Sequence, residues 1–122
     1  MPLRVQCIDH VGLHVDHVPT SEAFYRDVLY LEPIDRPDLG FPGAWFRIGT
    51  EQELHLIGKN SSPDNPPRER HFAMGIDDSA AWATHLTNLG LDLDGPRSRP
   101  DGAVQIFLRD PDGHVIELLC RT

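Results

Sequence analysis

Two segments alternate hydrophobic residues with small or imidazole-bearing ones, which is the period of a β-strand. Within residues 7–15 one face carries Val11, Leu13 and Val15, and the other carries Ile8, His10, Gly12 and His14. Within residues 71–76 the corresponding sets are Phe72, Met74 and Ile76 against His71, Ala73 and Gly75. The hydrophobic faces suit packing under a helix. The small residues beside each histidine leave space above the predicted sheet.

Each strand leads into a segment with helical periodicity. Residues 19–29 predict a helix with Thr20 or Ser21 as N-cap, and its hydrophobic stripe is Phe24, Val28 and Leu31. The counterpart runs from Asp78 or Ser79 to Leu89 and ends at Gly90, a residue suited to a left-handed cap. Tyr30 occupies the slot of Gly90, so it must adopt an unfavourable backbone conformation or end its helix differently.

The remaining hydrophobic runs predict strands around residues 44–48, 54–57, 103–109 and 114–120, with a strong turn signal at 110–113 and a weaker one at 50–52. Strand, helix and three strands, repeated once, indicate an α+β fold of two tandem βαβββ modules. We expect a curved mixed sheet with a metal-binding bowl and helices outside. The modules cover residues 5–58 and 71–121, joined by a proline-rich linker at 59–70.

Composition narrows the functional classes. The 122 residues suffice for one compact domain, and the formal net charge of −8 opposes binding to nucleic acid or anionic membranes. No hydrophobic run is long enough to span a bilayer, and none resembles a signal peptide. Cys7 and Cys120 lack metal-site spacing, so we expect reduced thiols in a cytoplasmic protein, although a bridge between them stays open.

The repeat also aligns four potential metal ligands. His10 and His71 open the two modules, while His55 and Glu117 lie on their closing strands, 45 and 46 residues later. All four fall on the face opposite the helix-packing residues. Nitrogen and oxygen donors of this kind bind a divalent Zn, Ni, Co, Mn or Fe ion. Burying Glu117 among hydrophobic strand residues would cost several kcal/mol without a compensating partner, roughly as for any buried charge.

Each candidate has an alternative explanation. His10 and His71 taken singly could be core histidines, Glu117 could be a solvated edge carboxylate, and His55 could lie near the metal without binding it. Four further residues are candidates for substrate binding, although solvent or the core could equally account for them: His14, Trp45, Arg47 and Lys59.

Three motifs carry a family resemblance: residues 9–15, 24–29 and, most specifically, 110–118. They resemble the vicinal oxygen chelate superfamily, which includes glyoxalase I, fosfomycin-resistance enzymes and extradiol dioxygenases. The resemblance implies paired βαβββ modules, with a metal held at the positions of His10, His55, His71 and Glu117 and chelating two substrate oxygens. Glu117 would then be both ligand and general base of a glyoxalase-like lyase or isomerase.

Two departures argue against glutathione as the substrate carrier. Relatives that use glutathione have an arginine where this chain has His14 and an asparagine where it has Lys59. The resemblance leaves three alternatives: a thiol transferase or other antibiotic-modifying enzyme, a small iron dioxygenase, and a metal-free drug-binding protein. It also implies a homodimer, with each metal site either within one chain or shared between two.

Overall fold

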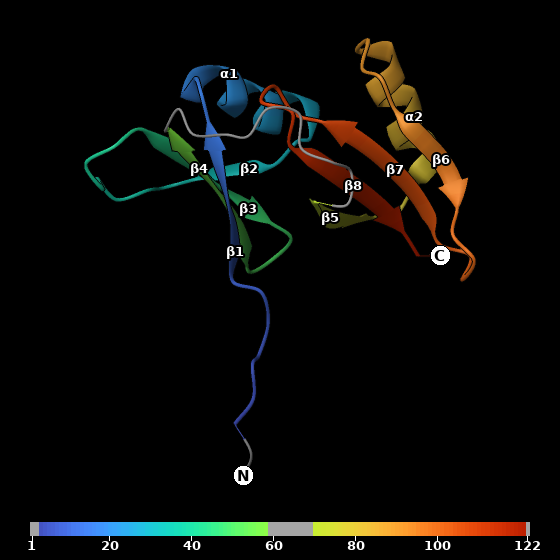
Figure 1. Ribbon diagram of the computed structural model, residues 1–122, viewed down its shortest axis with the longest axis horizontal. Helices are drawn as coiled ribbons and strands as arrows, with labels where there is room; N and C mark the ends of the chain where they lie inside the picture. The colour runs from blue at the N-terminus through green and yellow to red at the C-terminus, as the bar shows by residue number, and fades with distance from the viewer. Residues whose placement is uncertain (1–2, 59–69, 122) are drawn as a thin grey trace. The chain divides into compact units, whose positions relative to one another are not determined.

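The computed structural model describes residues 3–58 and 70–121, which divide into two compact units with a boundary at residues 61 and 62 (Figure 1). Each unit contains one four-stranded mixed sheet and one α-helix. The prediction of an α+β fold built from two βαβββ modules is confirmed, and each module has a sheet of its own. Residues 59–69 lie outside the described residues. They include Lys59 and all of the predicted linker except Arg70.

The sheet of the first unit has the order β1-β4-β3-β2. Its strands are β1 (His10–Val15), β2 (Glu32–Ile34), β3 (Gly43–Ile48) and β4 (Gln52–Gly58). β1 runs parallel to β4, whereas β3 is antiparallel to both β4 and β2. We expected the first strand to begin at Cys7. It begins at His10 because β4, its only neighbour among the described strands, starts opposite that point.

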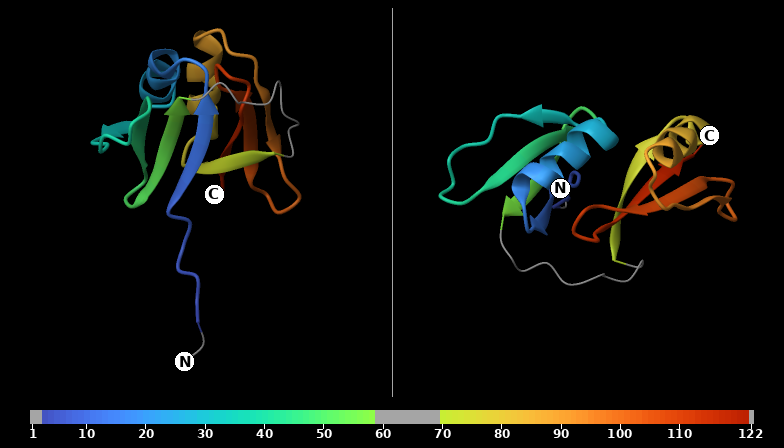
Figure 2. Two further views of the ribbon diagram at one scale, coloured as in Figure 1. Left: turned by 60° about the vertical axis from the view of Figure 1, so that its left-hand side comes forward. Right: turned by 90° about the horizontal axis from the view of Figure 1, so that it is seen from above.

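The helical segment of the first unit differs from its prediction. α1 (Val18–Ala23) begins after His17, whose Nδ1 accepts a hydrogen bond from the backbone N–H of Thr20, so neither Thr20 nor Ser21 is the N-cap. The helix continues as a π-helical turn, η1 (Phe24–Val28). The segment packs on β3 and β4, on one face of the sheet (Figure 2). The core below it includes Val15, Phe24, Tyr25, Phe46, Leu54 and Leu56.

The second unit repeats this arrangement, with sheet order β5-β8-β7-β6. Its strands are β5 (His71–Ile76), β6 (Asp94–Ser98), β7 (Val104–Arg109) and β8 (Val115–Cys120). α2 (Ser79–Asn88) begins at the N-cap Asp78, whose side chain accepts from the N–H of Ala81 at 2.9 Å. The helix packs on β6, β7 and β8, and Leu86, Ile106, Ile116 and Leu118 are buried at this interface.

Backbone conformation confirms two predictions about turns. Tyr30 has φ 58° and Gly90 has φ 81°, so both occupy the left-handed region at the same point of their modules. In the 110–113 turn, the buried Asp110 accepts hydrogen bonds from the N–H groups of Asp112 and His114, both at 2.9 Å. Cys7 and Cys120 form no disulfide, and no helix among the described residues has the length and hydrophobicity to cross a membrane.

Candidate functional site

Strand pairing stacks three rings on the open face of the first sheet. His55 on β4 lies in register with Gly12 on β1 and with Trp45 on β3. The His55 ring lies parallel to the Trp45 ring at a centroid distance of 4.0 Å, and it stacks on His10 at 4.1 Å. The structure therefore brings His10 and His55 together. Trp45, a candidate for substrate binding, lies on this face and is partly exposed.

Carboxylates orient both of the stacked imidazoles. His55 Nε2 lies 2.9 Å from Glu53 Oε1, and His10 Nδ1 lies 2.8 Å from Asp9 Oδ1. The His55 side chain is only 15% exposed, whereas that of His10 is 47% exposed. A histidine held through one nitrogen presents the other in a fixed direction, which is how metal-binding imidazoles are commonly oriented.

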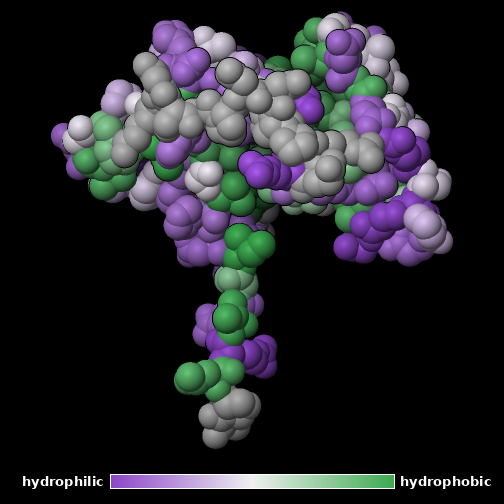
Figure 3. Space-filling view, viewed as in Figure 1, coloured by the Kyte–Doolittle hydropathy of each residue, from purple (hydrophilic) through white to green (hydrophobic). Residues whose placement is uncertain are grey.

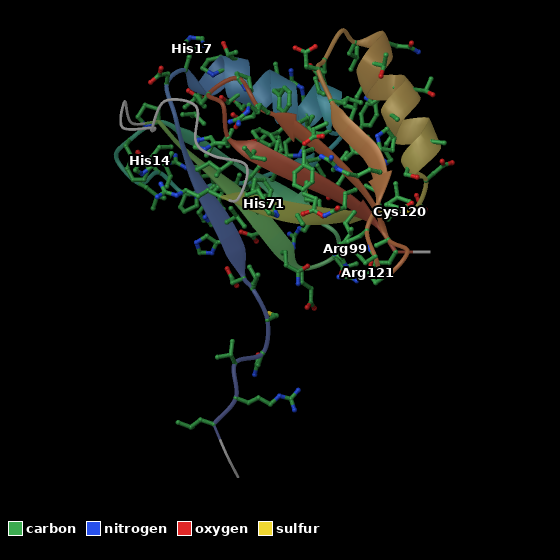
Figure 4. All side chains as sticks on the ribbon, turned by 45° about the vertical axis from the view of Figure 1, so that its right-hand side comes forward. His14, His17, His71, Arg99, Cys120 and Arg121 are labelled. Atoms are coloured by element: carbon green, nitrogen blue, oxygen red, sulfur yellow. The ribbon has the colours of Figure 1, made fainter. Side chains whose placement is uncertain are left out.

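The second unit brings its own predicted pair together. His71 Nε2 lies 2.9 Å from Glu117 Oε1, and Gln105 Nε2 donates to Glu117 Oε2 at 3.1 Å. The His71 and Phe107 rings lie nearly perpendicular to each other, with their centroids 5.4 Å apart. The Glu117 side chain is only 6% exposed, and each of its two carboxylate oxygens has a polar partner. Figure 4 shows His71 on its strand.

The two pairs occupy equivalent rows of their sheets. In the second unit Glu117 is in register with Ala73 and Phe107, as His55 is with Gly12 and Trp45 in the first. The duplication therefore places a small residue, a potential ligand and an aromatic ring side by side in each module. Chance placement of one side chain would not produce the same row of residues in both modules.

These donors suit a divalent ion in spacing and type. Two ligands that each lie about 2.1 Å from one ion are roughly 3.0–3.4 Å apart, close to the 2.9 Å between His71 Nε2 and Glu117 Oε1. Within residues 3–58 and 70–121, no three His, Cys, Asp or Glu side chains form a group that could hold a metal. The predicted ligands are thus in contact as two pairs, His10 with His55 in the first unit and His71 with Glu117 in the second.

Space next to each pair agrees with the prediction from small residues. A methyl group added at Gly75 would meet no atom within 4 Å, and one added at Gly12 would meet only Ile57 Cδ1, at 3.5 Å. A pocket of about 120 Å³ adjoins His10, Gly12, Trp45 and His55. A larger cavity of about 580 Å³ in the second unit is lined by Phe107 and Arg109, but neither His71 nor Glu117 is among its lining residues.

The other predicted substrate-binding residues are less closely connected to these pairs. His14 lies on β1 two residues beyond Gly12 (Figure 4), and strand alternation gives it the same face as His10. Arg47 lies one residue before the end of β3 and donates to the carbonyl of Thr50 at 3.4 Å, which ties it to the β3–β4 turn.

Sequence patterns missed three polar residues near the pairs: Gln105, Arg36 and Arg99. Gln105 bonds Glu117 directly, and Arg36 lines the smaller pocket. Arg99 follows β6 and makes a two-pronged contact with Asp101. Asp101, and to a lesser degree the nearby Glu117, raise the pKa of its guanidinium. The period-2 pattern gave Gln105 the same face as Glu117, so that residue could have been found.

Comparisons with known proteins agree with this geometry. The family model described as the Glyoxalase/Bleomycin resistance protein/Dioxygenase superfamily matches residues 7–118. The chain is 29% identical to Glyoxylase I 4 of Arabidopsis thaliana over 96% of this chain and 72% of that protein. It is 30% identical to the metallothiol transferase FosB of Shouchella clausii, covering 93% and 80%. A crystal structure of a glyoxalase family protein from Bacillus anthracis superposes with TM-score 0.86, at 25% identity over the full length of both chains.

Proposed function

Because the chain belongs to the glyoxalase/bleomycin resistance protein/dioxygenase superfamily, we propose that it is a divalent-metal-dependent lyase or isomerase of glyoxalase type. The observation that carries the proposal is the contact of His71 with the buried Glu117, which occupies the same row of its sheet as His55 does in the first module. A carboxylate oriented by neighbouring polar groups beside an imidazole is the arrangement that metal ligands commonly have.

His10, His55, His71 and Glu117 would hold the ion, a Zn, Ni, Co, Mn or Fe. When bound, such an ion stabilises negative charge that develops on two neighbouring substrate oxygens. Glu117 is the base in this proposal: a carboxylate oxygen takes the proton from a carbon beside a carbonyl and returns it to the adjacent carbon. Gln105 holds Oε2 at 3.1 Å, which fixes the plane of the carboxylate during both transfers.

Trp45 supplies a flat hydrophobic wall, and His14, Arg47 and Lys59 are the polar candidates for substrate contacts. A single imidazole at position 14 cannot reproduce the two parallel hydrogen bonds of an arginine to a carboxylate. We therefore expect a thiol other than glutathione, or a substrate without a thiol carrier.

Metal binding tests the proposal first. The metal-stripped protein, titrated calorimetrically with Zn²⁺, Ni²⁺, Co²⁺ and Mn²⁺, should bind at least one of them. Glu117→Gln and His71→Ala should lower the affinity about 100-fold or more, since even the loss of a group that only supports a ligand costs about 10–100-fold. The charge-matched control Glu51→Gln, on the exposed β3–β4 turn, should bind like the parent.

Activity tests it second. The metal-loaded protein should isomerise hemithioacetals of methylglyoxal, and Glu117→Gln should abolish the reaction even at a metal concentration that saturates the variant. Absence of turnover with glutathione and with other low-molecular-weight thiols would remove the isomerase proposal.

A thiol transferase is the second candidate, because one of the curated relatives has that activity in its name. Metal-dependent loss of free thiol with a small anionic electrophile, without hemithioacetal isomerisation, would favour this candidate.

A further inference from the structure

The pocket beside the histidine pair contains an arginine that the proposed chemistry does not use. Arg36 lies in the segment between β2 and β3, and its guanidinium lines the 120 Å³ pocket together with His10, Trp45 and His55. The rest of the wall is mainly hydrophobic and includes Leu39 and Phe41.

Two contacts with Phe41 hold the Arg36 guanidinium in place: a hydrogen bond at one end and an aromatic ring against its face. Arg36 Nη2 donates to the carbonyl of Phe41 at 2.9 Å, and Cζ lies 4.9 Å from the centre of the Phe41 ring. Gly43 provides the room, because a methyl group there would come within 2.9 Å of Arg36 Nε. This packing gives the charged group a fixed position at low additional entropic cost.

Within residues 3–58 and 70–121, Arg36 Nε is buried and has no hydrogen-bond partner, and no described carboxylate forms an ion pair with this arginine. Leaving a buried donor unsatisfied destabilises the folded state, and more so when the group is charged. Such an arrangement is unusual in a folded protein, and an anion beside the guanidinium would offset the cost.

We infer that Arg36 binds a small oxyanion group, a carboxylate or a phosphonate, at one end of the substrate. The positive charge of Arg36, with hydrophobic walls that exclude water, favours an anion over a neutral group. At roughly 30 Å³ per water molecule the pocket has room for about four waters, which suits one such group and is too small for a drug-sized ligand.

The inference deepens the proposed function, on which it rests for the neighbouring chemistry: the same His10 and His55 that are proposed to hold the metal also line this pocket. The oxyanion would fix one end of the substrate on the first unit. Arg36 would thereby decide which substrates are accepted and leave the proton transfer to other groups.

Fluorescence of Trp45 provides the test, since its ring lines the pocket. The chain has two tryptophans, so Trp82→Phe leaves Trp45 as the sole reporter. Acetate, methylphosphonate and neutral acetamide are titrated into this protein, first metal-free and then with a metal that it binds. We expect saturable quenching by the two anions and none by acetamide.

Arg36→Gln should weaken anion binding at least tenfold, consistent with loss of hydrogen bonds from a charged donor. Arg26→Gln is the matched control, because it removes the same charge from the same unit where Arg26 contacts Asp27 instead of the pocket. That control should bind within twofold of the parent. Arg36→Lys keeps the charge and serves where the glutamine variant fails to fold, with an expected loss of a few-fold.

Equal anion affinity in the parent and the Arg36 variants, or quenching by acetamide at the same concentrations, would overturn the inference. Arg36-dependent binding of anions by a protein that binds no metal would uphold it while the proposed function fails. Tight metal binding together with anion affinity that does not depend on Arg36 would overturn the inference and leave the proposed function standing.

Discussion

At the scale of single residues, Tyr30 carries a backbone conformation that its side chain disfavours. Its φ of 58° lies in the left-handed region, where a non-glycine residue is strained by about 1 kcal/mol or more. The Tyr30 side chain is 64% exposed, so the core does not require it. Gly90 ends the helix of the other module at the same point without this penalty.

Tyr30→Gly should therefore stabilise the protein by about 0.5–1 kcal/mol, because the relief of strain exceeds the added freedom of the unfolded chain. Urea unfolding monitored by circular dichroism measures the change. Tyr30→Ala keeps the strained conformation and should show no such gain. A glycine variant no more stable than the alanine variant would contradict the interpretation.

Residue patterns assign the histidines and Glu117 to a sheet face but do not place Arg36 or Arg99, for a physical reason. The four proposed ligands lie on strands, where the period of two fixes the face that each side chain occupies. Arg36 lies in a segment without regular structure, and Arg99 follows an irregular edge strand. Their positions depend on tertiary contacts, such as the packing of Arg36 on Phe41 and over Gly43, that no local period encodes.

At the scale of the elements, the sequence did not predict the residue ranges of two edge strands, β2 and β6. β2 contains Pro33 and β6 contains Gly95 and Pro96, residues that are depleted in strands. An edge strand tolerates proline because one side of its backbone has no strand to pair with. The module repeat required a strand at each place, but the composition concealed both.

The π-helical turn has a comparable explanation. One residue more separates His10 from Tyr30 than separates His71 from Gly90. A wider turn accommodates one extra residue without shifting either end of the helical segment, and η1 lies within this interval. Sequence periodicity predicted a single regular helix because it cannot distinguish a local insertion from a longer helix.

Close packing of β3 on β4 gives a prediction at this scale. A methyl group at Gly43 would come within 2.4 Å of the backbone carbonyl oxygen of Leu56. Gly43→Ala should therefore force the strands apart and destabilise the protein by about 1–3 kcal/mol, measured by urea unfolding. Gly12→Ala, where the nearest atom is a flexible side chain at 3.5 Å, should cost far less. Equal losses in the two variants would contradict the steric argument.

At the scale of the whole molecule, an unpaired N-terminal segment suggests how copies of the chain associate. Residues 3–9 extend away from the first sheet (Figure 1), and Leu3, Val5 and Ile8 are exposed along them (Figure 3). The nearest backbone contact of this segment is at its end, from the N–H of Glu53 to the carbonyl of Asp9 at 3.1 Å. Contiguous exposed hydrophobic residues commonly mark a protein interface.

We expect the protein to form a two-fold symmetric homodimer in which this segment of one copy packs on the other. Light scattering at micromolar concentration should give twice the chain mass. The double variant Leu3→Asp and Val5→Asp should shift the protein toward monomer, because it places charges in a hydrophobic contact. Leu89→Asp, at an exposed leucine after α2, should leave the dimer intact. A parent protein that stays monomeric at these concentrations would rule out both the dimer and any metal site shared between two chains.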